Sequence, residues 1–307
     1  MHLSTNASVA ALRELQRGVA GLTEKLAQPR SRAIIFAGAA LVFLAGLVVA
    51  VRARPDVWSD LTAWPIVLSL ALAIPATILA NALEFWLSVR LLGHSVAFSK
   101  ALEITIAGSA ANMLPLPGAV MVRMAALKSM GSSYLHGASA TAYSFSIWLS
   151  ASAVFAGGAL YLLQSGLIGP VMVAMGSVGL AFTLYAAARQ FGRLRYAIGM
   201  ALAKTLMLLL DAVRIWLCFA AIGEATQFLQ ASVLTISAVV GSAVAIVPAG
   251  LGIRELVSAA IAPIVALAPA ATLLAMSLSR ILGFVVVIPL SLVLAGKNVT
   301  AARKGRA

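Results

Sequence analysis

The stretch Val247-Pro-Ala-Gly-Leu-Gly-Ile-Arg-Glu255 interrupts a long apolar region with one proline, two glycines and two charged residues. In a bilayer, irregular backbone is tolerated only where it is buried in protein or lines a wet cavity. Arginine and glutamate at membrane depth mark candidate functional sites. A similar interruption occurs at Leu116–Arg123, and in both stretches an arginine follows a proline by six residues. Two broken apolar segments in matching places of two halves indicate a transporter-type central site.

The composition identifies the class of protein. The chain has 307 residues, of which 62% are hydrophobic and only 10% charged, and its mean hydropathy is +1.03. Soluble domains carry about 25% charged residues, so we expect an integral membrane protein. The net charge of +13 would suggest nucleic acid for a soluble protein, but cationic cytoplasmic loops beside anionic lipid explain it here. The one cysteine, Cys218, excludes an internal disulfide.

Six segments reach the roughly 20 residues that a membrane-spanning helix needs. They are residues 33–51, 64–92, 136–163, 168–188, 197–222 and 270–295. Two more apolar stretches, 99–130 and 228–267, are each interrupted near the middle, and we expect each to form a re-entrant helix pair. The predicted fold is an all-α inverted-repeat bundle with six spans and two broken pairs, in a single transmembrane domain over residues 33–296.

The two termini are basic. Leucines and a valine recur at three- and four-residue steps within residues 1–32, which predicts an amphipathic helix on the membrane surface; a loosely ordered basic tail is the alternative. A second basic tail covers residues 297–307. If both broken segments are re-entrant, the clusters of lysine and arginine all fall on one side of the membrane. The positive-inside rule then places both termini in the cytoplasm.

An internal repeat relates the two halves of the chain. Asn81–Gly93 matches Asp211–Gly223 at an offset of 130 residues, and the two interruptions follow at an offset of 131. The repeats are therefore 64–163 and 197–295, and three crossings separate their first spans. Because an odd number of crossings reverses direction, we expect inverted repeats related by a pseudo-two-fold axis in the membrane plane. Chance similarity between apolar sequences is the alternative.

Acidic and basic residues are balanced within the apolar segments, which indicates internal pairing because a lone charge there is costly. The eight charged residues are Glu84, Glu103, Arg123, Asp211, Arg214, Arg254, Glu255 and Arg280. Glu84 and Arg214 occupy equivalent repeat positions with opposite charge, so we predict an ion pair between them. Asp211 shares a helix face with Arg214 and belongs to the same set of structural ion pairs. A stripe of polar residues along one helix face, such as the one with Asp211 and Arg214, serves either as polar contacts between helices or in substrate passage.

Arg123 and Arg254 begin the second helix of each broken pair, where free N–H groups and the helix dipole favour an anion. Gly250 and Gly252 allow the backbone to approach such a ligand closely. The predicted site is therefore a phosphate-binding site with Glu255 at its edge. In the alternative interpretation the glycines only form a turn and a carboxylate neutralises Arg254, with Glu103 or the stripe carboxylates better placed than Glu255. Arg280 is either a third positive contact or a member of an ion pair.

The sequence has no Walker loop for nucleotide binding. It also lacks a cluster of histidine, cysteine and carboxylate residues at metal-ligand spacing, and a nucleophile with a histidine and an acid in the usual local patterns. We therefore expect no cofactor, no metal and no enzymatic activity. A catalytic site assembled from distant residues is the alternative.

At its broken segments the chain resembles the transmembrane region of lysylphosphatidylglycerol synthases, the flippase-like domain of the multiple peptide resistance factor. The resemblance covers about residues 33–295. It is carried by Pro248–Glu255 with Arg280 and Pro289 in the second repeat, and by Asn112, Pro115, Gly118 and Arg123 in the first. Ala119 stands where the family usually has glutamate, and Tyr143–Trp148 lacks the usual acid–arginine pair. No synthase domain follows residue 307, so lipid aminoacylation is not expected.

The resemblance implies a flippase-like translocase that moves an anionic lipid or a lipid-linked glycan between leaflets. It implies substrate contacts by Arg254, Arg123, Gly250, Gly252, Glu255, Arg280 and Asn112. It also implies a bacterial or archaeal cytoplasmic membrane as the location. Two alternatives from other classes are a non-transporting scaffold that recruits a lipid-modifying glycosyltransferase, and an intramembrane transferase.

Overall fold

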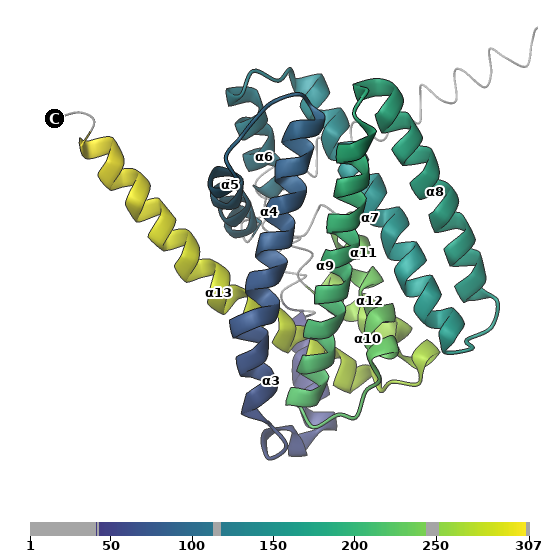
Figure 1. Ribbon diagram of the computed structural model, residues 1–307. Helices are drawn as coiled ribbons and strands as arrows, with labels where there is room; N and C mark the ends of the chain where they lie inside the picture. Colours follow the sequence, from purple (N-terminus) through teal and green to yellow (C-terminus); the bar gives the residue numbers. More distant parts are fainter. Residues whose placement is uncertain (1–40, 42, 113–117, 244–251, 305–307) are drawn as a thin grey trace, which may run out of the picture.

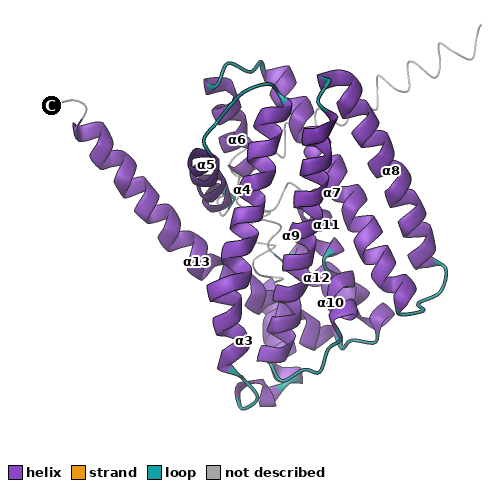
Figure 2. Cartoon of the chain, viewed as in Figure 1, coloured by secondary structure: helices purple, strands orange, loops and turns teal. Residues whose placement is uncertain are grey.

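The computed structural model describes residues 41, 43–112, 118–243 and 252–304. Every regular element in these residues is a helix (Figure 2). Five helical stretches are long and apolar enough to cross a membrane: Ala63–Leu91, Tyr134–Leu162, Ile168–Phe191, Leu194–Ala221 and Pro269–Gly296. The chain is therefore an all-α, multi-pass membrane protein.

Five of the six predicted spans have a counterpart within three residues at each end in these membrane-length helices. The first predicted span, 33–51, lies partly outside the described residues, which begin with the shorter apolar helix Phe43–Ala53. The predicted amphipathic helix in residues 1–32 lies wholly outside them, as does the end of the basic tail. After Phe43–Ala53 comes the 3-10 turn η1 (Pro55–Trp58).

The first long span combines α3 (Ala63–Leu68), a π-helical turn η2 (Ser69–Ala73) and α4 (Ile74–Leu91). Pro75 near the start of α4 explains the π-helical turn, because proline has no N–H to donate and its ring crowds the preceding turn. The wider π-helical turn leaves room for that ring. The helix continues beyond it, with the Thr77 hydroxyl donating to the Ala73 carbonyl at 2.8 Å.

Both interrupted segments consist of helices too short to cross a bilayer. The first contains α5 (Phe98–Ala111) and α6 (Gly118–Ser129), on either side of residues 113–117. The second contains α10 (Phe228–Leu234), α11 (Ile236–Ala243), α12 (Ile253–Ile261) and the 3-10 turn η4 (Ala262–Val265). Even the 14 residues of α5 extend only about 21 Å along the axis, against a hydrocarbon thickness of about 30 Å.

Helices α4 and α9 (Leu194–Ala221) run in opposite directions side by side through the centre of the bundle (Figure 1). In that view α5 and α6 lie in the upper half of the bundle, and α10 and α12 lie in its lower half. Helices α7 (Tyr134–Leu162) and α8 (Ile168–Phe191) form a hairpin on one side. On the other side α13 (Pro269–Lys304) begins inside the bundle and then extends away from it.

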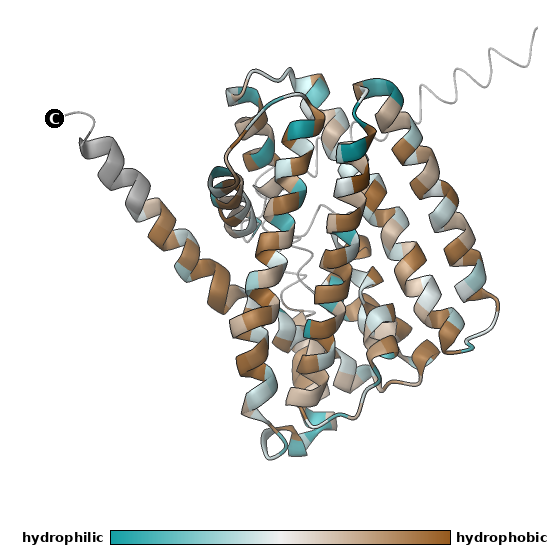
Figure 3. Ribbon diagram, in the orientation of Figure 1, coloured by the Kyte–Doolittle hydropathy of each residue, from teal (hydrophilic) through white to brown (hydrophobic). Residues whose placement is uncertain are grey.

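The outward faces of the long helices are apolar (Figure 3). On α8, for example, Met175, Val178 and Phe182 are exposed. By contrast, the carboxylates of Glu84 in α4 and Glu255 in the short helix α12 are completely buried. This inverse distribution is what a hydrocarbon solvent requires, because polar groups in the membrane need protein partners.

Candidate functional site

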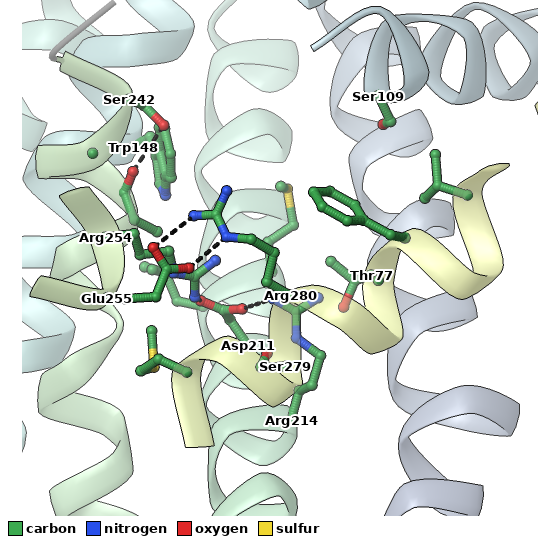
Figure 4. Close-up of a pocket in the computed structure, with 18 residues that line it drawn as sticks. Thr77, Ser109, Trp148, Asp211, Arg214, Ser242, Arg254, Glu255, Ser279 and Arg280 are labelled. Atoms are coloured by element: carbon green, nitrogen blue, oxygen red, sulfur yellow. Dashed lines mark hydrogen bonds and ion pairs between the residues drawn. The ribbon is translucent and has the colours of Figure 1, made fainter. Parts of the chain in front are cut away.

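A cavity of about 300 Å³ lies among α9, α12 and α13 inside the bundle (Figure 4). Its charged lining consists of Asp211, Arg214, Arg254, Glu255 and Arg280. The uncharged polar part of the wall consists of Thr77 of α4, Ser109 of α5, Trp148 of α7, Ser242 of α11 and Ser279 of α13. The cavity therefore brings together elements from both halves of the sequence around three arginines and two carboxylates.

Local geometry explains how α9 and α12 present their charges. Asp211 and Arg214 are three residues apart and share one face of α9. Helix α12 starts after Gly252, whose φ of +79° is a conformation that glycine adopts without strain. Arg254 and Glu255 are the second and third residues of α12 and project in different directions, because neighbouring helical residues lie about 100° apart. Arg254 accordingly reaches α9 while Glu255 reaches α13.

The five charges form two ion-pair groups. Asp211 receives a hydrogen bond on each carboxylate oxygen, one from Arg214 Nη2 and one from Arg254 Nη2 at 2.5 Å. Glu255 accepts from both Nε and Nη2 of Arg280, the second at 3.2 Å. The Nε atoms of Arg214 and Arg254 are buried, and within the described residues neither has a hydrogen-bond partner. Two arginines that line the cavity thus each retain one buried donor with unused bonding capacity.

A second polar cluster surrounds the buried carboxylate of Glu84. Arg123 Nη1 lies 2.9 Å and Lys204 Nζ 3.6 Å from Glu84 Oε2. The Ser144 hydroxyl donates to Oε1, and Arg123 Nη2 donates to Asn81 Oδ1 at 2.7 Å. Four helices meet here, namely α4, α6, α7 and α9. The cluster fixes the first broken pair to the centre of the bundle.

The predicted Glu84–Arg214 ion pair is wrong. Glu84 pairs with Arg123 and Lys204, whereas Arg214 pairs with Asp211. The reason is the register of the antiparallel helices α4 and α9, in which Glu84 faces Lys204. Arg214 is ten residues further along α9, which is about 15 Å along the helix axis. Equivalent repeat positions approach each other only at the crossing point of the two helices.

The structure brings Arg254, Glu255 and Arg280 together in the cavity wall, with Gly252 beside them at the start of α12. Gly250 lies outside the described residues. Arg123 belongs to the Glu84 cluster and not to this wall. Asn112 ends α5 and accepts a hydrogen bond from the backbone N–H of Ala119 at 2.7 Å. Asn112 therefore caps α6 and ties the two helices of the first broken pair together.

Of the carboxylates considered as partners for Arg254, the one on α9 pairs with it, namely Asp211. Glu103 instead pairs with Lys100 at 2.8 Å on the exposed start of α5. Sequence reasoning missed the pairing of Lys204 with Glu84, and it missed Trp148. The Trp148 ring lies 5.5 Å from Lys204 Nζ and lines the cavity. Nothing in the sequence distinguishes this tryptophan from one that faces lipid.

The described residues contain no group of three or more histidine, cysteine, aspartate or glutamate side chains suited to a metal ion. Their charge chemistry is dominated by guanidinium groups, which bind carboxylates and phosphates through paired hydrogen bonds. No protein-family model matches the sequence, and no curated protein matches it at significant similarity. The flippase-like resemblance therefore stays a prediction, and the arginine-lined cavity is the observation on which a function has to rest.

Proposed function

We propose that this protein binds the headgroup of an anionic amphiphile in the cavity and moves it between the two leaflets of the membrane. The observation that carries the proposal is the cavity wall, where three arginines face only two carboxylates. Two of these arginines keep a buried Nε donor without a partner in the described residues. A phosphate group offers oxygens that match such donors, and lipid headgroups are the abundant phosphates at a membrane.

The position of Asp211 suggests how the ligand is held and released. Asp211 accepts hydrogen bonds from both Arg214 and Arg254. Its single negative charge is therefore shared by two positive charges and cannot neutralise both. An incoming phosphate competes with Asp211 for the same guanidinium groups and does not have to break the Arg280–Glu255 pair. Such competition keeps binding reversible, and reversibility is a requirement for a translocation site.

An inverted repeat supports movement between leaflets. The Trp86 indole donates to the Val96 carbonyl at 3.0 Å, and the Trp216 indole donates to the Thr226 carbonyl at 2.9 Å. The donor and the acceptor of the second bond each lie 130 residues after those of the first. Gly93 and Gly223, at the same offset, both have positive φ.

Arg123 and Arg254 also bind equivalent positions of α4 and α9, because they reach Asn81 and Asp211. Helices α5 and α6 approach from one end of the bundle, and α10 and α12 from the other (Figure 1). In our proposal the two halves expose the cavity alternately to each leaflet while the acyl chains stay in lipid. We further propose that both termini face the cytoplasm of a bacterium or archaeon.

The proposal is tested by reconstituting the purified full chain into liposomes with fluorescent phosphatidylglycerol and measuring the transbilayer movement of the lipid. We expect wild type to accelerate movement clearly above protein-free liposomes. Arg254→Gln removes hydrogen bonds to a charged group, which contribute about 1.5–3 kcal/mol, so its rate should fall roughly 10- to 150-fold. Arg195→Gln is the matched control, because Arg195 contacts Tyr196 at the exposed start of α9.

The control variant should translocate at the wild-type rate. Equal rates for Arg254→Gln and Arg195→Gln would remove the cavity from the transport path. No acceleration by wild type with any of several anionic headgroups would contradict translocation itself. In that case the scaffold that recruits a glycosyltransferase becomes the better explanation.

A further inference from the structure

We infer that the ligand of the cavity carries a single negative charge, so that it is a phosphodiester headgroup and not a phosphomonoester or a diphosphate. This inference rests on the proposed function and specifies the substrate class of the same site. Its basis is the charge of the cavity wall. Arg214, Arg254 and Arg280 contribute three positive charges, and Asp211 and Glu255 contribute two negative charges. The wall therefore carries a net charge of +1.

The internal segments outside the described residues leave this balance unchanged. Residues 113–117 and 244–251 contain no charged side chain. The other acidic residues of the described chain lie elsewhere: Glu84 is bound by Arg123 and Lys204, Glu103 by Lys100, and Glu224 by Arg54. Asp56 and Asp60 lie in or beside η1, before the first long span.

Helix α9 carries one further cation close in sequence to the cavity residues, Lys204, which belongs to the Glu84 cluster. Lys204 precedes Asp211 by seven positions in α9, or about 10 Å along the axis. The Trp148 ring lines the cavity and lies 5.5 Å from Lys204 Nζ. The charge of the Glu84 cluster is therefore counted apart from that of the cavity.

A net charge inside the hydrocarbon region is costly until a counter-charge neutralises it. A monoanion brings the cavity to neutrality. A dianion brings the net charge of the cavity to −1, and a buried net charge of either sign is costly. A phosphodiester carries one negative charge at pH 7, whereas a phosphomonoester carries about 1.5 to 2. Charge balance thus favours the diester.

Hydrogen-bond geometry points in the same direction. Arg214 and Arg254 lie on opposite oxygens of Asp211 and each retains a buried Nε donor. A phosphodiester has two non-bridging oxygens, one for each of these guanidinium groups. Arg280 already gives Nε and Nη2 to Glu255. The volume of about 300 Å³ is at the lower end for small-molecule sites and suits a small headgroup.

The inference is tested by calorimetric titration of the detergent-solubilised full chain at pH 8, where a phosphomonoester is fully dianionic. The probes are short-chain phosphatidylglycerol, short-chain phosphatidate and short-chain phosphatidylcholine, which differ in headgroup charge but share their acyl chains. Dimethyl phosphate and inorganic phosphate are the soluble counterparts. We expect wild type to bind phosphatidylglycerol at least tenfold more tightly than phosphatidate, and both soluble anions more weakly than the lipid.

Charge-changing variants make the test specific. Asp211→Asn raises the charge of the wall to +2, so it should reverse the order and favour phosphatidate. Glu255→Gln makes the same change at another position and should give the same reversal, so it serves if Asp211→Asn does not fold. Arg214→Gln lowers the charge to zero and should weaken both anionic lipids.

Tighter binding of phosphatidate by wild type, with an unchanged order in both +2 variants, overturns the monoanion inference while leaving the proposed function intact. If dimethyl phosphate binds as tightly as phosphatidylglycerol, the ligand need not have acyl chains, and the claim that it is an amphiphile is overturned. If neither anionic lipid binds more tightly than phosphatidylcholine, the proposed function fails together with the inference.

Discussion

Replacing Glu84 with glutamine should lower the midpoint of thermal unfolding of the purified protein by roughly 10 °C. The Glu84 carboxylate is completely buried and bound by Arg123 and Lys204. Removing its charge leaves two cations with no carboxylate between them. Breaking a buried pair in this way costs about 3–5 kcal/mol, and each kcal/mol shifts the midpoint by about 2–4 °C in proteins of 150–250 residues. Glutamine keeps the volume, so the effect reports on charge.

Two controls separate charge from packing. Glu103→Gln removes a carboxylate whose pair with Lys100 is exposed, and such pairs contribute about 0–1 kcal/mol, so the midpoint should stay within a few degrees. Adding Lys204→Met to Glu84→Gln returns the cluster to its original net charge of +1 and should recover part of the loss. Equal small losses for Glu84→Gln and Glu103→Gln would show that the buried cluster does not stabilise the bundle.

Gly118→Ala should be the most damaging change of a single methyl group in the first broken pair. A Cβ atom at position 118 would lie 2.1 Å from the Ala111 carbonyl oxygen, which is backbone and has no rotamer to move. The start of α6 would have to shift away from α5 and weaken the hydrogen bond from Ala119 to Asn112. We expect a loss of about 3 kcal/mol, at the upper end of the usual cost of overpacking, measured as a lower unfolding midpoint.

Gly158→Ala is the matched control in the helix α7. A Cβ atom there would have no neighbour within 4 Å, and alanine favours a helix interior by roughly 0.5–1 kcal/mol over glycine. Gly158→Ala should therefore raise the midpoint slightly. A midpoint for Gly118→Ala equal to that of wild type would mean that α5 and α6 are not packed as closely as the structure shows.

The two polar clusters divide the roles that the sequence left open between polar contacts and substrate passage. Around Glu84, the two cations and Ser144 all bind the same carboxylate, which is the pattern of polar contacts between helices. Around Asp211, the charges line a cavity and keep unpartnered donors. On that difference we propose the Asp211 cluster, and not the Glu84 cluster, as the site of substrate passage. Helix α9 carries members of both clusters on one face.

Much of the fold was predictable because it follows from local hydrophobicity. The length of an apolar run against the thickness of the bilayer decides where a span begins and ends, so five predicted spans agree with the structure. Pro117 and Pro248 mark the interruptions because proline disrupts a continuous helix. Arg254, Glu255 and Arg280 were identifiable for a related reason, since charges inside apolar segments are conspicuous.

Partners of the charges were not predictable in the same way. The repeat offset predicted Arg214 as the partner of Glu84. The register of α4 against α9 instead places Lys204 beside Glu84. Asn112 is a cap for α6, whereas the family resemblance implied only a substrate contact for it. Trp148 enters the cavity wall from a helix whose sequence has no charge nearby. Each of these depends on which helix faces which, and that information is spread over residues far apart in the chain.

The sequence by itself determined that this is a multi-pass helical membrane protein with two interrupted segments and buried charges, because hydropathy, proline and charge act over one helix length at a time. Only the tertiary structure decided that Asp211 is shared by Arg214 and Arg254, that Glu255 holds Arg280, and that these residues surround a cavity. Pairing between helices depends on their relative register and tilt, and those are set by packing over the whole bundle.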